Sequence, residues 1–258
     1  MLINSFFLKK KEQHKIKMLY EIKNNSFITI DDLKSLFSIS EYKAKALIND
    51  VRKDIHKSGY GEKFRFFSRA IFCISIEGID MLIQEIVNAY YRESQYVRFI
   101  IEYALLNNQV SVISEKVHIS ISKSYNIKRI LQKITLENVS LSRENKEIFY
   151  RKLLFTIFSN STDLLWEYSC KNVDDFLNEV LFVLKDIFIV RLTDKRMRSI
   201  KIILLIIYYR VKYGFEMNKG IFNLPSTGNY YESRIDDLLR LPISKKLKIG
   251  RDDFFFIL

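Results

Sequence analysis

Two sets of polar side chains in this sequence have the types and spacing that recognise the edges of nucleic-acid bases. Residues three or four positions apart share one face of a helix, and each set follows a serine, Ser40 or Ser120. Asn can pair with adenine, Arg with guanine, and Lys with guanine or phosphate. The candidate DNA-binding residues on these two predicted helices are Tyr42, Lys43, Lys45, Asn49, Lys53, Ser122, Lys123, Asn126, Arg129 and Lys133. Ordinary helix surfaces carry the same residue types, so the elements that position them decide the interpretation.

The two predicted helices lie in segments that match when one is moved along the chain by eighty positions. Residues 33–40 and 113–120 share one pattern: an apolar residue, three of any type, a second apolar residue, one of any type, Ile and Ser. Apolar residues four apart form the buried stripe of a short helix. The Ile closes a turn, and the Ser hydroxyl caps the next helix. The repeat predicts two helix-turn-helix units, in which the second helix enters the major groove of DNA.

The flanking residues support this interpretation. Thr29 and Asp32 have the spacing of a capping box for the first short helix. An amphipathic helix is predicted before each unit, over Lys9–Asn24 and Tyr91–Leu106. The predicted inward positions of the two long helices are Ala44, Leu47, Ile48, Val51, Ile55, Ile127, Ile130, Leu131 and Ile134. Two ordinary helical hairpins are the alternative.

Residues 63–76, between the repeats, alternate in polarity and are rich in aromatic and β-branched types, which predicts a small β-hairpin. A hairpin after a recognition helix is a wing. Its cations could then contact phosphates beside the groove. The candidate wing residues are Lys63, Arg65 and Arg69. The alternative is a hairpin packed on the next domain, because its apolar side chains need burial. These are Phe66, Phe67, Ile71 and Phe72.

Composition sets broad limits. The net charge of +12 over 258 residues suits a polyanionic partner, although abundant Lys with Ile, Asn, Phe and Tyr is also typical of AT-rich genomes. Only 7 Gly and 2 Pro are present, which predicts a mainly helical chain. Cys73 and Cys170 form no disulfide or metal framework and indicate the cytoplasm. The longest apolar run, 202–209, is far shorter than the ~20 residues of a membrane span, so no membrane contact is expected.

The sequence predicts neither an enzyme nor a bound metal or cofactor. His14, His56 and His118 are far apart and have no Cys, Asp or Glu partners at ligand spacing. The seven glycines are scattered and form no phosphate-binding loop. Three pairs of adjacent aspartates are interpreted as solvated helix starts, because neighbouring residues on a helix point in different directions. These pairs are 174–175, 236–237 and 252–253.

The chain resembles the Mga/AtxA-like virulence regulators of Gram-positive bacteria. The similarity lies in the tandem units, in the linking segment 90–94 (YYRES) and in the continuation 141–158 (LSRENKEIFYRKLLFTIF). It covers essentially the whole chain but only about the N-terminal half of the family's architecture, as in a fragment or a short paralogue. The resemblance implies a mainly α chain with three domains. These are a winged helix-turn-helix over 1–80, a second, Mga-type helix-turn-helix over 81–140 and a helical PRD-like regulatory bundle over 141–258.

The chain departs from this family in its last part. Family regulatory domains are modified on histidines by the sugar phosphotransferase system, but residues 144–258 contain no histidine. Direct phosphohistidine control is therefore not expected. Helices are predicted over 144–159, 173–189 and 194–213, with a shorter one near 232–241. The apolar segment 254–258 is hard to cover within one subunit and predicts a homo-oligomer.

Together these features predict a sequence-specific transcription regulator, an activator by its resemblance, whose partner is double-stranded DNA. Two alternatives remain open from the residues alone. A plasmid or phage replication initiator also uses tandem winged helices. A truncated paralogue could instead dimerise with a longer regulator and bind no DNA itself.

Overall fold

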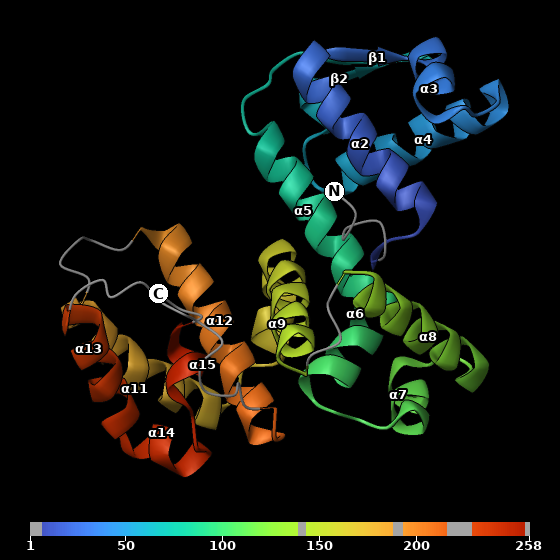
Figure 1. Ribbon diagram of the computed structural model, residues 1–258. Coiled ribbons are helices and arrows are strands. Elements are labelled where there is room, and N and C mark those ends of the chain that lie inside the picture. Colours follow the sequence, from blue (N-terminus) through green and yellow to red (C-terminus); the bar gives the residue numbers. More distant parts are fainter. Residues whose placement is uncertain (1–6, 139–142, 188–192, 216–228, 256–258) are drawn as a thin grey trace. The chain divides into compact units, whose positions relative to one another are not determined.

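The computed structural model describes residues 7–138, 143–187, 193–215 and 229–255 (Figure 1). The described chain is mainly helical, as predicted, and contains a small three-stranded sheet. Its internal contacts divide it into two compact units, Met1–Tyr96 and Val97–Leu258. The three domains expected from sequence, with boundaries at residues 80 and 140, remain a prediction. Each unit is described separately below.

The first unit combines helices with the sheet. The elements in chain order are α2 (Lys10–Asn25), β1 (Phe27–Thr29), α3 (Ile30–Phe37), α4 (Glu41–Lys57), a 3-10 turn (Gly61–Lys63), β2 (Phe64–Phe66), β3 (Ala70–Cys73) and α5 (Ile79–Glu93). Helices α2, α4 and α5 contact one another, and their buried faces form the core. The predicted helix over Lys9–Asn24 is confirmed by α2.

The sheet confirms the predicted hairpin and adds a strand to it. β2 and β3 pair antiparallel, with Phe64 opposite Cys73. β1 pairs with the other edge of β3, with Phe27 opposite Phe72, so the strand order is β1-β3-β2. Ile28 and Ile71 face the core from neighbouring strands. β1 was not predicted, because three residues before a helix are too short to establish an alternating pattern.

The second unit is helical throughout its described part. Its elements are α6 (Gln95–Ile100), which begins just before the unit boundary, a π-helix (Ile101–Leu105), α7 (Val110–Val117), α8 (Ile121–Asn138), α9 (Arg143–Asn160), α10 (Thr162–Glu167), α11 (Lys171–Ile187), α12 (Asp194–Lys212), α13 (Asn229–Arg240), α14 (Pro242–Leu247) and α15 (Arg251–Phe255). α12 packs against α9 and α11, and nearly all residues from Ile200 to Val211 are buried. A helix that is apolar on all sides belongs in such a core.

The prediction of one continuous helix over Tyr91–Leu106 is wrong. α5 ends at Glu93, and Ser94 has an extended backbone with ψ of 116°. A new helix starts at Gln95 and changes to π-helical hydrogen bonding at Ile101. The four helices predicted after residue 140 are confirmed by α9, α11, α12 and α13 to within three residues at their described ends. Residues 188–189, the predicted end of one of them, lie outside the described residues.

Two expectations about the last residues are corrected. Asp252 and Asp253 are buried and not solvated, and Arg151 of α9 donates to Asp253. Phe254 is fully buried within its own unit, so at this position the apolar segment is covered by a single subunit. Residues 256–258 of that segment lie outside the described part.

Neighbouring residues on α7 provide a test of this packing. Ile113 is fully buried and Val112 is about half exposed. We expect Ile113→Ala to lower the free energy of unfolding by about 2–5 kcal/mol, because it removes buried methyl groups and leaves a cavity. Val112→Ala, the control, should change it by less than about 0.5 kcal/mol. Chemical denaturation of both variants measures the difference, and equal losses would contradict the assigned burial.

Candidate nucleic-acid interface

Two helix pairs, α3–α4 and α7–α8, have the same local geometry. Each has an eight-residue helix, a three-residue turn and a longer helix. Ser38 (φ 52°, ψ 51°) and His118 (φ 54°, ψ 51°) open the two turns in the left-handed region. Ser40 Oγ accepts from the backbone N–H of Lys43 at 3.4 Å, and Ser120 Oγ accepts from its counterpart, Lys123, at 3.2 Å. The predicted serine caps are confirmed at both positions.

The predicted capping box at the start of α3 is also present. Thr29 Oγ1 accepts from the backbone N–H of Asp32 at 3.2 Å. The backbone N–H of Thr29 donates to Asp32 Oδ2 at 2.9 Å. In the first helix pair, local hydrogen bonds therefore define where α3 begins and where α4 begins after the turn.

The eighty-residue repeat extends to the buried positions of both pairs. Residues at equal places in the two pairs are buried together: Ile30 and Val110, Leu33 and Ile113, Ala44 and Ser124, Leu47 and Ile127, Val51 and Leu131, and Ile55 and Thr135. Of the predicted inward positions, Ile130 and Ile134 are only half-buried, and the other seven are buried. The same inward faces therefore orient α4 and α8 against α3 and α7.

Sequence reasoning missed a buried hydroxyl pair in the second helix pair. Ser114 Oγ on α7 and Ser124 Oγ on α8 lie 2.8 Å apart. Ser114 Oγ also lies 2.8 Å from the carbonyl oxygen of Val110, one turn earlier. In the first pair the position of Ser124 is taken by Ala44. A small residue at both equivalent places was the available signal, since two helices can approach closely only where side chains are small.

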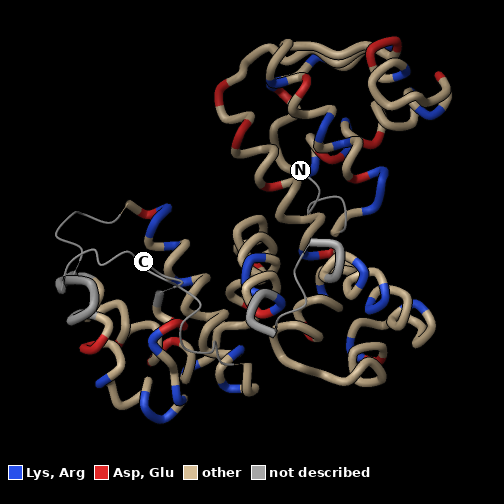
Figure 2. Tube along the Cα trace, viewed as in Figure 1, with Lys and Arg blue, Asp and Glu red and all other residues tan. Residues whose placement is uncertain are grey.

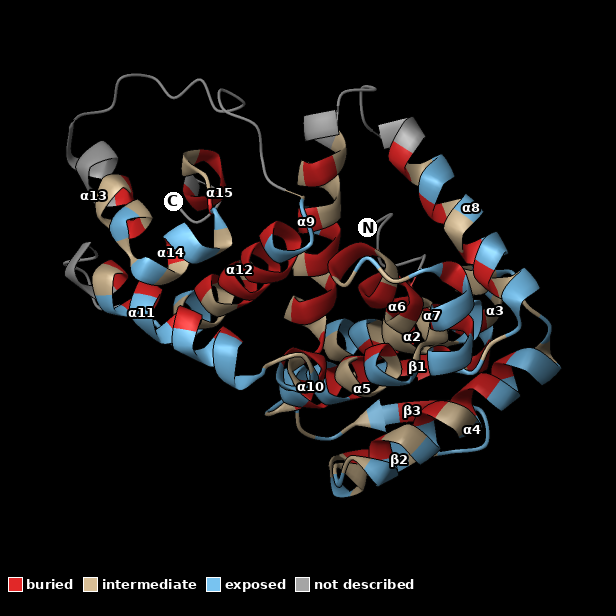
Figure 3. Ribbon diagram, turned by 90° about the horizontal axis from the view of Figure 1, so that it is seen from below, coloured by how far each residue is buried: buried red, intermediate tan, exposed pale blue. Residues whose placement is uncertain are grey.

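The candidate residues on α4 and α8 lie on the outer faces of both helices (Figure 3). Tyr42 is 83% exposed. All ten candidates on these helices are exposed except Lys123, which is half-buried. Arg129 Nη2 donates to Asn126 Oδ1 at 3.1 Å, so these two side chains share one face of α8. The structure thus brings each group together on its own helix.

Some of the candidate cations already have partners within the protein. Lys45 Nζ lies 2.8 Å from Glu41 Oε1, and Arg69 lies 3.6 Å from the same oxygen. The hydrogen bond and charge of Lys45, followed by the charge of Arg69, lower the pKa of the Glu41 carboxyl. Lys63 Nζ donates to the backbone carbonyl of Glu77 at 2.8 Å. Among the predicted wing cations, Arg65 is exposed on β2, opposite Phe72 of β3.

The hairpin aromatic side chains are only partly buried. Ile71 is in the core, as expected, but Phe67 is 58% and Phe72 42% exposed. Phe72 stacks on Phe27 of β1, with ring centroids 5.6 Å apart, and Phe67 packs edge-on against it. The expectation that all four apolar side chains of the hairpin are buried is therefore wrong. Mutual stacking covers part of their surface instead.

Lys and Arg recur along α8 and are interspersed with acidic residues elsewhere in the chain (Figure 2). Within the described residues, no group of three His, Cys, Asp or Glu side chains is placed to hold a metal ion. No helix in that part of the chain is long and apolar enough to cross a membrane.

No protein-family model and no curated protein matches the chain.

The equivalence of Ala44 and Ser124 leads to a stability prediction. Ser124→Ala should cost at most about 1 kcal/mol, because Ser114 keeps its backbone acceptor. Ser124→Leu should cost about 1–3 kcal/mol or more, because extra methylenes must fit where two helices cross. Thermal and urea unfolding measure both variants. A harmless Ser124→Leu would mean that α7 and α8 do not approach closely at this position.

Proposed function

We propose that this chain is a sequence-specific, duplex-DNA-binding transcription regulator that uses α4 and α8 as recognition helices. In this proposal each helix pair is a helix-turn-helix unit, and the hairpin β2–β3 is the wing of the first. The second half would be a helical regulatory bundle, as in the Mga/AtxA-like regulators that the sequence resembles. The partner would be double-stranded DNA.

One observation carries the proposal: the same turn and cap geometry occurs twice, and each copy presents an exposed polar face. A helix-turn-helix places base-reading residues near the start of its second helix. Tyr42 and Lys43 have such places on α4, and Ser122 and Asn126 have them on α8. The repeat of the turn and cap geometry, and not the polar faces alone, favours two helix-turn-helix units over two ordinary helical hairpins.

The two recognition faces differ in chemistry. On α8, Arg129 and Asn126 are hydrogen-bonded to each other, which partly pre-orders a guanine and an adenine reader. On α4, Asn49 is the candidate base reader, and Lys43 and Lys53 are exposed cations near the two ends of the helix. Arg65 on β2 is the best-placed wing cation, because it is exposed and Arg69 and Lys63 have other partners.

The primary test is selection of bound duplexes from a random library with the full chain. We expect an enriched sequence whose affinity falls steeply with salt, because each phosphate contact releases condensed counterions. Fluorescence anisotropy between about 50 and 200 mM salt measures the slope. Failure to enrich any sequence, with no binding at the lowest salt, would refute the proposal.

Two single variants should then separate base reading from phosphate contact. Arg129→Ala should cost about 1–3 kcal/mol at one base step and relax specificity there. Lys53→Ala should weaken binding to all duplexes evenly and reduce the salt slope by about one. Lys152→Ala, an exposed lysine on α9, is the charge-matched control and should bind normally. Equal, sequence-independent losses for Arg129 and Lys53 would contradict the role assigned to Arg129.

A further inference from the structure

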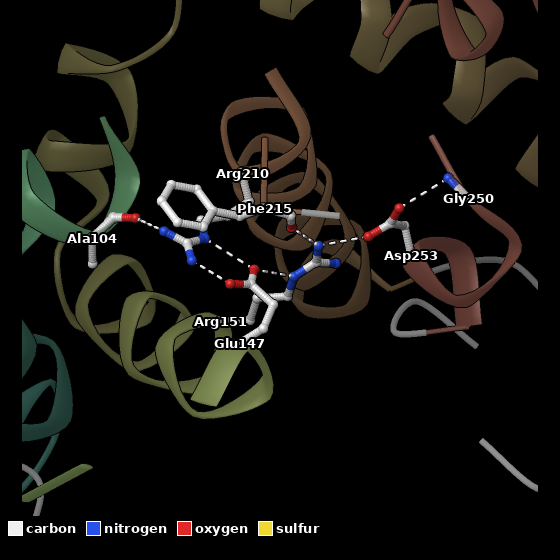
Figure 4. Close-up of polar contacts among 7 residues, drawn as sticks. All are labelled: Ala104, Glu147, Arg151, Arg210, Phe215, Gly250 and Asp253. Carbon is white, nitrogen blue, oxygen red and sulfur yellow. Dashed lines mark hydrogen bonds and ion pairs between the residues drawn. The ribbon is translucent and has the colours of Figure 1, made fainter. Parts of the chain in front are cut away.

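A chain of four buried charged side chains connects α9, α12 and α15 (Figure 4). Arg151 Nη2 donates to Asp253 Oδ1 at 2.5 Å, and Arg151 Nε donates to Glu147 Oε1 at 2.9 Å. Arg210 donates to both oxygens of Glu147, with its Nε 2.9 Å from Oε1. None of the four side chains is more than 8% exposed. We call these residues, Glu147, Arg151, Arg210 and Asp253, the charge network.

Arg210 extends the charge network to the π-helix that precedes α7. Its Nη1 donates to the carbonyl oxygen of Ala104, in the last turn of that π-helix. The last carbonyls of a helix have no partner within the helix, and a cation is favourable at that end. The guanidinium of Arg210 lies over the ring of Phe215, 3.7 Å from its centroid, which restricts its orientation. The position of the π-helix end therefore depends on Arg210.

The same π-helix is fixed to the second helix pair through Glu102. Its carboxylate, 2% exposed, lies 2.6 Å from Lys116 Nζ on α7. It also accepts from Asn108 Nδ2 at 2.6 Å, in the segment that leads to α7, and from Tyr168 OH at 3.1 Å. A displaced π-helix would carry Glu102 away from its partner on α7. π-helical segments are frequent at functional positions.

The balance of charge makes the network sensitive to loss of any member. It contains two arginines and two carboxylates, so its formal charges cancel. Without the carboxylate of Asp253, a buried positive charge would be left over. Arg151 Nη1 already has no hydrogen-bond partner among the described residues. Removing one partner of a buried ion pair is strongly destabilising, whereas replacing both is often tolerated. The network is therefore complete only while α15 is docked.

We propose that α15 is a latch, which completes the charge network when docked and thereby holds the π-helix and the second helix pair in the geometry that binds DNA. Release of α15 would leave the charge of Arg151 unbalanced beside Glu147, the carboxylate that Arg151 shares with Arg210. The hold of Arg210 on the π-helix would then loosen, and α7 and α8 would become mobile. The DNA part of this inference rests on the proposed function, and the mechanical coupling does not.

Hydrogen exchange of the full chain, measured by mass spectrometry, tests the coupling without DNA. Asp253→Asn keeps the side-chain shape and removes the charge. We expect amide exchange in the π-helix, α7 and α8 to accelerate by about tenfold or more, while the helices of the first unit keep their rates. The control is Asp236→Asn. It removes an exposed ion pair between Asp236 and Arg251, also on α15, and should leave α7 and α8 unchanged.

A double variant separates charge imbalance from general damage. Arg151→Met together with Asp253→Asn removes both charges of one pair and leaves Glu147 paired with Arg210. Exchange in α7 and α8 should return to within about threefold of the wild type. In parallel, Asp253→Asn should weaken binding to the selected duplex by about tenfold, and the double variant should restore it.

The outcomes are distinct. Acceleration confined to α13–α15 would overturn the latch, and so would a double variant as labile as the single one. If Asp253→Asn unfolds the whole second unit, a double variant that refolds and regains slow exchange supports the latch, and one that stays unfolded overturns it. If the wild type binds no duplex but exchange follows the expected pattern, the proposed function fails and the coupling stands.

Discussion

The close crossing of a short helix over a longer one is the contact on which both helix pairs depend. It requires a small residue on the long helix, and Ala44 and Ser124 are fully buried at the same place in the two pairs. It also requires a sharp reversal of the chain, which Ser38 and His118 supply in the left-handed region. Once these conditions are met, the helical period determines which side chains face outward. The outer faces of α4 and α8 are therefore consequences of the crossing.

The parts of the fold that sequence predicted are those that depend on local spacing. Serine caps, the Thr29–Asp32 box and the inward stripes arise from residues three or four positions apart, so their pattern is visible in the printed chain. The break at Ser94 and the strand β1 were missed, because a single residue and a three-residue strand leave no period to detect. The exposed faces were predicted correctly. The partners of Lys45, Lys63 and Arg69 could not be predicted, because they depend on side-chain geometry in the folded chain.

The charge network was invisible in the sequence for a different reason. Glu147 and Arg151 are four positions apart and resemble an ordinary surface pair on a helix. Arg210, which pairs with Glu147, lies 63 residues after it in the chain. Asp253, which pairs with Arg151, lies 102 residues after it. Adjacent aspartates at a helix start normally indicate solvation, and only the packing of α9, α12 and α15 reverses this at Asp253. Burial of charge is a property of tertiary contacts.

The long helices of the two pairs are held by different chemistry. In the first unit, Asp54 of α4 pairs with Lys15 of α2 at 2.7 Å and accepts from the hydroxyl of Tyr90 on α5. Burial, together with the charge of Asp54, raises the pKa of Tyr90, which keeps this hydroxyl a donor. In the second unit a neutral hydroxyl pair joins α8 to α7, the short helix of its own pair.

This difference explains how α4 can present cations although it also contains three carboxylates. Asp50 and Asp54 are four positions apart and face α2, where Lys11 and Lys15 neutralise them at 2.5 and 2.7 Å. Glu41, the third, pairs with Lys45 near the helix start. The acidic side chains of α4 thus serve packing within the unit. Lys43 and Lys53 remain on the exposed side without an ion pair to a carboxylate of α4. The positive face of α4 therefore results from the ion pairs that its acidic side chains form elsewhere, and not from the net charge of the chain.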